Sequence, residues 1–237
     1  EQLHAEGWIE GRRGSGTYVT TSPPDAAAVA TEPSPVPRPG VHGIDLTPGS
    51  PWLEGMDRAA WRRAWRAAAA VVPDSRPLRA GVDEYREAVV EHLLRHRGLV
   101  VGGPETVLAT GGTTAAVVEL AATTLRSGDT VAVEEPGYQR TVGALRAAGI
   151  RVVPAPVDHS GIVVDRIPRG VRAVYCSPAH QYPIGGRLPA DRRSALVRRA
   201  REEGWLIVED DYDGELRYDV APLPVLASMA PDVVVHL

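Results

Sequence analysis

Hydrophobic and polar residues follow two periods along the chain, and these periods predict its secondary structure. A spacing of three to four residues between apolar positions, typical of helices with one buried face, occurs over 56–72, 82–97, 113–125, 139–148 and 191–203. Short Val- and Ile-rich runs, typical of buried strands, occur at 106–110, 130–134, 150–154, 172–177, 205–209 and 232–236. Strands and helices alternate from residue 106 onwards. We therefore predict an α/β fold with a mostly parallel sheet covered by helices on both faces, in three layers.

The N-terminal residues have a different pattern, which predicts the end of a helix followed by a β-hairpin. Gly7 is placed to end the helix, and the basic turn 12–16 (Arg-Arg-Gly-Ser-Gly) joins two β-prone segments. Residues 22–43 contain six prolines and no regular period, as semi-rigid linkers do. We therefore expect a small N-terminal piece at 1–21, a linker at 22–43 and a larger domain at 44–237.

Composition narrows the classes of function. All 26 basic residues are arginine, so the chain contains no lysine for a Schiff base or a phosphate-binding loop. A net charge of −4 confines any contact with nucleic acid to a local basic spot such as Arg12 and Arg13. The single cysteine, Cys176, excludes a disulfide framework within the chain, and no apolar run is long enough to span a membrane. We expect a cytoplasmic protein.

Residues that could bind a ligand follow several of the predicted strands. Gly111 and Gly112 precede Thr113 and Thr114 at the start of a helix, where backbone N–H groups and hydroxyls can hold a phosphate; a plain strand-to-helix turn has the same pattern. Tyr138 follows the next strand and offers a ring on which a planar heterocycle can stack, or it is a half-buried residue at a helix start. A proline-stiffened loop with polar side chains occupies 177–186.

The segment 209–215 concentrates carboxylates just after a strand, and like charges so close together need compensation. A calcium loop is disfavoured because Val220 stands at the twelfth position, where an EF-hand has a bidentate Glu. A protonated ring nitrogen is a second candidate partner, and capping of a turn is a third. His92 and His96 lie four residues apart but lack the Glu of a zinc-protease motif, so we predict no metal site.

Taken in order, the motifs GGTTAA (111–116), EEPGYQR (134–140), SPAHQYPIGG (177–186) and VEDDYDGELRY (208–218) resemble the type I fold of aminotransferases that depend on pyridoxal 5'-phosphate (PLP), in the version found in MocR-type regulators of the GntR family. The segment LHAEGWIEGRRGSGTYV (3–19) resembles the last helix turn and the wing of the GntR winged helix-turn-helix. The resemblance spans nearly the whole chain. It implies an incomplete aminotransferase domain preceded by a truncated DNA-binding domain.

The resemblance also implies roles for individual residues. Gly112, Thr113 and Thr114 would hold the PLP phosphate and Tyr138 would stack on the ring. Asp210 would pair with the pyridine nitrogen, Tyr212 would bond the ring hydroxyl, and His180 belongs to the regulators' His-Gln pair. Arg12 and Arg13 would contact DNA from the wing. The Schiff-base lysine is expected beyond Leu237, so we predict no catalytic residue within the chain.

The function implied is that of a PLP-binding, DNA-binding transcription regulator, a homodimer that responds to a small amino compound. The alternative is a PLP-dependent aminotransferase acting on an amino acid or amine. Tyr182 stands where classical aminotransferases have an Asn, a departure that argues against efficient transamination. A third hypothesis is a module that only sequesters PLP.

Overall fold

The computed structural model describes residues 9–12, 14–19, 53–73, 75, 78–214 and 224–237. These residues fall into two units, 1–72 and 73–237, which are described separately. The predicted domain boundaries at 21/22 and 43/44 lie outside the described residues. No helix in the described part of the chain is long and apolar enough to cross a membrane.

The first unit contains the predicted hairpin and the helix predicted over 56–72. Strand β1 (Ile9–Arg12) pairs antiparallel with β2 (Gly16–Val19), and Gly14 and Gly16 take the positive φ angles that the tight turn needs. Helix α2 (Arg58–Ala69) begins where the Asp57 carboxylate accepts two backbone N–H bonds. Both predictions are confirmed. The helix end expected before the hairpin lies outside the described residues.

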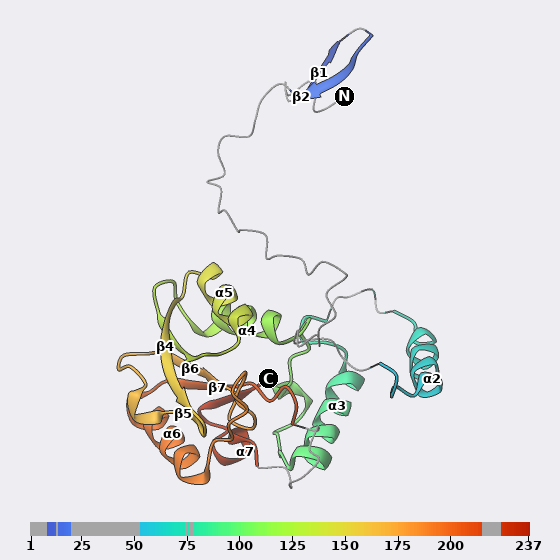
Figure 1. Cartoon of the computed structure of the whole chain (residues 1–237). Helices are drawn as coiled ribbons and strands as arrows, with labels where there is room; N and C mark the ends of the chain where they lie inside the picture. The colour runs from blue at the N-terminus through green and yellow to red at the C-terminus, as the bar shows by residue number, and fades with distance from the viewer. Residues whose placement is uncertain (1–8, 13, 20–52, 74, 76–77, 215–223) are drawn as a thin grey trace, which may run out of the picture. The chain divides into compact units, whose positions relative to one another are not determined.

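The second unit is built around a six-stranded sheet (Figure 1). Its helical segments are α3 (Asp83–His92), η1 (Leu93–Arg97), η2 (Pro104–Thr106), α4 (Thr113–Thr124), α5 (Gln139–Ala147), η3 (Val164–Arg166), α6 (Ala190–Glu203) and α7 (Leu226–Met229). Its strands are β3 (Thr130–Glu135), β4 (Arg151–Asp158), β5 (Gly161–Ile162), β6 (Ala173–Cys176), β7 (Leu206–Glu209) and β8 (Val234–His236). The strand order is β5-β4-β3-β6-β7-β8, and β5 alone runs antiparallel to its neighbour.

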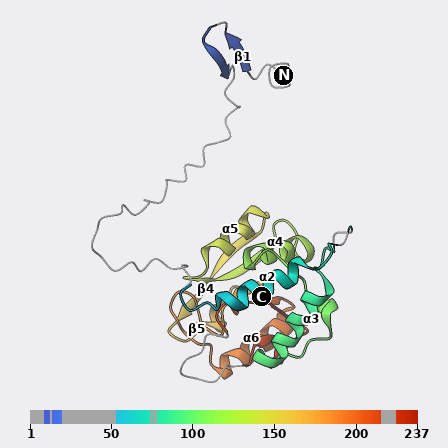
Figure 2. The same cartoon turned by 90° about the vertical axis from the view of Figure 1, so that its right-hand side faces the viewer.

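The sheet has an apolar cluster on each face, which confirms the predicted three layers. On β6 all four side chains are buried and alternate between the two faces: Ala173 and Tyr175 face α4 and α5, while Val174 and Cys176 face the α6 side. Helices α4 and α5 cover the first face and α6 the second (Figure 2). Because both faces are covered, the central strands β3, β6 and β7 are buried along nearly their whole length.

Strand β4 contains Pro154 and Pro156, which lack the N–H that a strand normally donates. The two prolines are two residues apart and so point to the same side of the strand. This side faces away from β3, because the Pro156 carbonyl accepts the Val163 N–H at 2.9 Å, and β5 pairs there only with residues 157 and 158. This explains how β4 continues to Asp158, four residues past the predicted end.

One predicted strand is wrong. Residues 106–110 form the end of the short helix η2 and an irregular segment, in which Ala109 N–H donates to the Ala80 carbonyl at 2.9 Å. A strand exists only with a hydrogen-bonded neighbour, and the described strands offer none at this position. Strand β5 and helix α7, with two and four residues, are too short to leave a periodic signal.

A buried ion pair connects η1 to the loop after β7. Arg97 donates to the Asp211 carboxylate and, at 2.8 Å, to the Gly214 carbonyl, and the Arg97 and Asp211 side chains are 1% and 3% exposed. Burial raises the pKa of Asp211, and Arg97 opposes that rise. Two segments 114 residues apart in sequence are thus held by one guanidinium.

We predict that Arg97→Met lowers the free energy of unfolding by about 3–5 kcal/mol at pH 8, because it leaves a buried carboxylate without its cation. Without Arg97 the pKa of Asp211 rises further above its unfolded value, so the deficit should shrink as the pH falls and Asp211 takes up a proton. Urea unfolding at several pH values measures both effects.

Arg95→Met is the matched control. Its partner Glu91 and Arg95 itself are 58% and 69% exposed, so the loss should stay below about 1 kcal/mol. Equal losses in the two variants would contradict the assignment of the Arg97 pair as a stabilising contact.

Candidate functional site

The carboxyl ends of four parallel strands lie at one edge of the sheet. Strands β3, β6, β7 and β8 are consecutive neighbours and point the same way, so the loops that follow them come together, as the sequence predicts. These loops start at residues 136, 177, 210 and 237.

Three tyrosines from different loops form a contiguous aromatic group at this edge. Tyr182 packs edge to face against Tyr138, with ring centroids 6.2 Å apart, and against Tyr212 at 6.3 Å. His180 stacks on Tyr212 at 5.9 Å. The structure therefore brings together Tyr138, His180 and Tyr212, all predicted from sequence, through Tyr182, which was not assigned to the site.

His180 also links Tyr212 to an acidic neighbour. Its Nδ1 contacts the Asp213 carboxylate and lies 3.2 Å from the Tyr212 hydroxyl. Burial and the nearby carboxylates raise the pKa of the Tyr212 phenol, so the hydroxyl stays protonated and can donate a hydrogen bond.

Asp210 follows β7 and is almost completely buried, with 5% of its surface exposed. The Tyr175 hydroxyl donates to its Oδ2, while its Oδ1 has no hydrogen-bond partner among the described residues. Burial raises the pKa of Asp210, opposed by the Tyr175 hydrogen bond and by His236. A buried carboxylate oxygen without a partner is costly, so Asp210 is suited to accept a proton donor or a cation from a ligand.

Two further carboxylates of the acidic segment have strong donors within the chain. Glu209 accepts the backbone N–H groups of Leu226 and Ala227, at 2.7 and 3.1 Å, and lies 3.2 Å from His236. Arg97 pairs with Asp211, as described above. One oxygen each of Asp210, Asp211 and Asp213 has no hydrogen-bond partner among the described residues. Asp211 is paired with Arg97 and Asp213 with His180, whereas the donor to Asp210 is the neutral Tyr175 hydroxyl, so Asp210 is the carboxylate suited to a ligand.

Gly112, Thr113 and Thr114 lie at the start of α4, as predicted. Gly112 has a φ of 122° and open space where a Cβ would stand, and no described side chain caps the helix. Thr110 Oγ1 is 3.4 Å from the Gly112 nitrogen. In the described structure no hydrogen bond or ring contact joins Thr113 or Thr114 to the aromatic group. The free N–H groups of the first helical turn are suited to an anion.

Several residues of this site were missed by sequence reasoning. Tyr175 lies inside a buried strand, where a hydroxyl must find a partner, and this was the available signal. Arg97 and His236 gave no signal, because their partners lie far away in sequence. Arg12 forms part of β1 and Arg13 lies outside the described residues; the side chains of both are undescribed.

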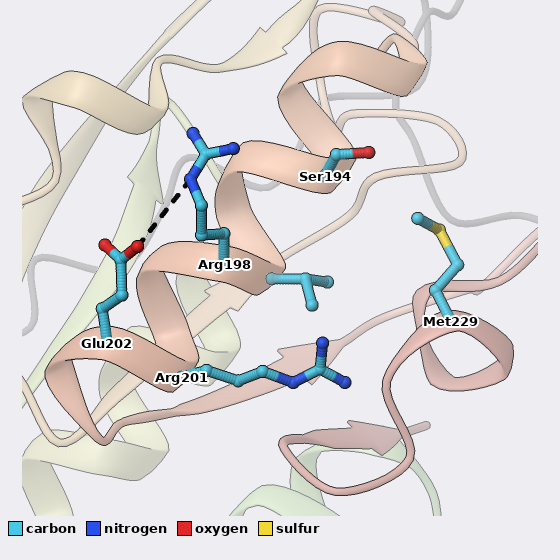
Figure 3. Close-up of a pocket in the computed structure, with 6 residues that line it drawn as sticks. Ser194, Arg198, Arg201, Glu202 and Met229 are labelled. Carbon is cyan, nitrogen blue, oxygen red and sulfur yellow. Dashed lines mark ion pairs between the residues drawn. The ribbon is translucent and has the colours of Figure 1, made fainter.

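A hollow of about 340 Å³ lies elsewhere, between α6 and α7 (Figure 3). Its charged lining is already paired: Arg201 makes two hydrogen bonds to Asp232, and Arg198 lies 3.9 Å from Glu202. None of its lining residues carries a buried polar atom without a partner in the described structure, so we place the candidate site at the strand ends instead.

Known proteins resemble this chain in sequence and in fold. The family model for aminotransferase class I and II matches residues 61–227, which is more than half of the chain. The solved α-aminoadipate aminotransferase LysN of Thermus thermophilus, complexed with N-(5'-phosphopyridoxyl)-L-leucine, is 29% identical with a TM-score of 0.63; the match covers 75% of this chain and 46% of LysN.

Two curated relatives match almost the whole chain, and both are regulators. The pyridoxine biosynthesis transcriptional regulator PdxR of Corynebacterium glutamicum is 38% identical over 98% of this chain and 51% of its own length. The probable rhizopine catabolism regulatory protein MocR of Rhizobium meliloti is 30% identical over 97% and 50%. The chain therefore spans about half the length of these relatives, and the predicted resemblance to MocR-type regulators is confirmed. By its family match and its fold, the chain belongs to aminotransferase class I and II.

Proposed function

We propose that the protein is a MocR-type transcription regulator of the GntR family, whose aminotransferase-fold domain binds PLP and whose N-terminal winged helix-turn-helix binds DNA. The curated relatives that match the chain from end to end support this proposal, since both are named as regulators. It works in the cytoplasm as a homodimer that responds to a small amino compound.

The observation that carries the cofactor proposal is the Oδ1 of buried Asp210, which has no partner among the described residues. The charge of Asp210 also acts on the Tyr212 phenol of the aromatic group. A carboxylate in this position would hold the protonated pyridine nitrogen of PLP, and Tyr138 would stack on the ring. The Tyr212 hydroxyl, oriented by His180, would donate to the ring oxygen. When bound, PLP supplies an electron sink for amino compounds.

The phosphate of PLP would lie at the start of α4. Gly112 leaves the backbone accessible there, and the N–H groups of the first turn, together with the Thr113 and Thr114 hydroxyls, provide donors for an anion. Residues 1–237 include no lysine, so none of their side chains can form a Schiff base with PLP, and these residues would hold PLP noncovalently.

An aminotransferase is the second candidate function, and the similarity to LysN favours it. The regulator is preferred because its relatives cover nearly the whole chain, including the hairpin. The hairpin would serve as the wing, with Arg12 and Arg13 contacting DNA phosphates or the minor groove.

The role proposed for Asp210 can be tested by removing its charge. Asp210→Asn keeps the shape of the side chain but removes the charge, so we expect PLP affinity to fall by about tenfold to a hundredfold, the value of a charge-assisted hydrogen bond. Equilibrium dialysis of the full chain measures it. Asp232→Asn, at an exposed carboxylate, should leave the affinity unchanged. Equal affinities for wild type and Asp210→Asn would remove Asp210 from the site.

The second prediction concerns the phosphate. Thr113→Val should weaken PLP binding by about tenfold and leave the binding of pyridoxal, which has no phosphate, unaltered. Thr123→Val, at the other end of the same helix, is the control. A parallel loss for both ligands would show that the threonine acts on something other than the phosphate.

The third prediction concerns DNA. In the complete protein, Arg12→Ala combined with Arg13→Ala should reduce the slope of log K against log salt by about two, since each phosphate contact contributes about 0.9. Fluorescence anisotropy at several salt concentrations gives the slope. Arg169→Ala, at an exposed arginine of the second unit, should not change it. An unchanged slope in the double variant would exclude the wing contact.

A further inference from the structure

Strand β3 carries a buried carboxyl near its carboxyl end that has no role in the function proposed above. Glu134 is 3% exposed, and its Oε2 accepts the Ser177 backbone N–H at 3.2 Å and the Gln181 side-chain amide at 3.1 Å. Its Oε1 has no hydrogen-bond partner within the described structure. One carboxylate oxygen therefore holds two points of the loop after β6.

Gln181 extends this connection to the loop after β3. The side chain is 1% exposed, and its amide nitrogen also contacts the carbonyls of Pro136 at 2.9 Å and Tyr182 at 2.6 Å. Its Oε1 accepts the Ile184 N–H at 3.2 Å. The side chain thus joins the loop that begins at Pro136 to its own loop.

The two loops that meet in this way carry the facing rings of Tyr138 and Tyr182. The fit is close, because a Cβ on Gly137 would come within 2.2 Å of the Glu134 carbonyl oxygen. We propose that Glu134 is a positioning residue: through Gln181 it holds the loop after β6 against the loop after β3 and so sets the spacing of Tyr138 and Tyr182. This inference rests on the proposed function, since the rings flank the proposed cofactor site.

The Glu134 carboxyl has a pKa close to neutrality. Burial raises the pKa of Glu134 to about 7, with Gln181 and Ser177 opposing the rise and the charge of Asp210 adding to it. The other titratable groups that face it are Cys176 and Tyr212. Because the folded pKa exceeds the unfolded one, ionisation of Glu134 lowers stability as the pH rises from about 4.5 to 7, and the effect is constant above that.

Hydrogen exchange of the full chain without ligand tests the positioning directly. Glu134→Ala removes both hydrogen bonds, so amide exchange over 178–186 should accelerate by about tenfold or more, whereas Glu134→Gln keeps an acceptor oxygen and should restore protection. Glu135→Ala, at the exposed neighbour, is the matched control. Unchanged exchange in Glu134→Ala, or equal acceleration in the control, overturns the proposal whether or not the chain binds PLP.

Affinity for PLP gives an independent readout. Glu134→Ala and Gln181→Ala should each weaken binding by about tenfold, and the double variant no further, because the two side chains act as one unit. Additive losses overturn the proposal. A wild-type chain that binds no PLP refutes the proposed function instead, and the exchange data then decide this inference alone.

The pH profile completes the test if Glu134→Ala fails to fold. The melting temperature of the wild type should fall between pH 4.5 and 7 relative to that of Glu134→Gln, while Glu135→Gln follows the wild type. Parallel profiles for wild type and Glu134→Gln would mean that the Glu134 carboxyl is not held in the buried contact with Ser177 and Gln181, and would overturn the proposal.

Discussion

Four carboxylates are buried at one edge of the sheet, and the need to compensate them organises the second unit. Glu134, Glu209, Asp210 and Asp211 all lie at or just after the carboxyl ends of β3 and β7, where side chains leave the apolar interior. A buried charge without partners costs several kcal/mol, so each carboxylate recruits donors from elsewhere in the chain. The loops are held in place by these hydrogen bonds as much as by apolar packing.

The donors come from three separate elements. Arg97 reaches Asp211 from the end of η1, the first turn of α7 closes onto Glu209, and Tyr175 reaches Asp210 from the neighbouring strand. Asp210 has the neutral Tyr175 hydroxyl as its donor and one oxygen without a partner among the described residues, so the same requirement that orders the loops leaves a need for a further donor at the site. A ligand with a positively charged donor meets it, which is why the aromatic rings and the free oxygen are best explained together.

Much of the second unit could be predicted from sequence, because buried parallel strands and amphipathic helices leave strong periodic signals. The failures have physical causes. Residues 106–110 have the composition of a strand, but composition cannot supply a neighbour to pair with. At the site, the loops that carry Tyr138, His180, Asp210 and Tyr212 could be located because each follows a strand end, whereas the choice of His180, Asp210 and Tyr212 within these loops depended on the resemblance to the family. Arg97 could not be predicted, since nothing local distinguishes its guanidinium from those of the other arginines among the 26 in the chain.

The close approach of Gly137 to the Glu134 carbonyl has an evolutionary consequence. With backbone oxygen 2.2 Å from the place of a Cβ, position 137 accepts no residue larger than glycine unless the loop moves. Any homologue that replaces this glycine must also have reshaped the turn that presents the tyrosine at 138. The identity of one small residue should therefore separate, within an alignment, the relatives that share this ring geometry from those that have abandoned it.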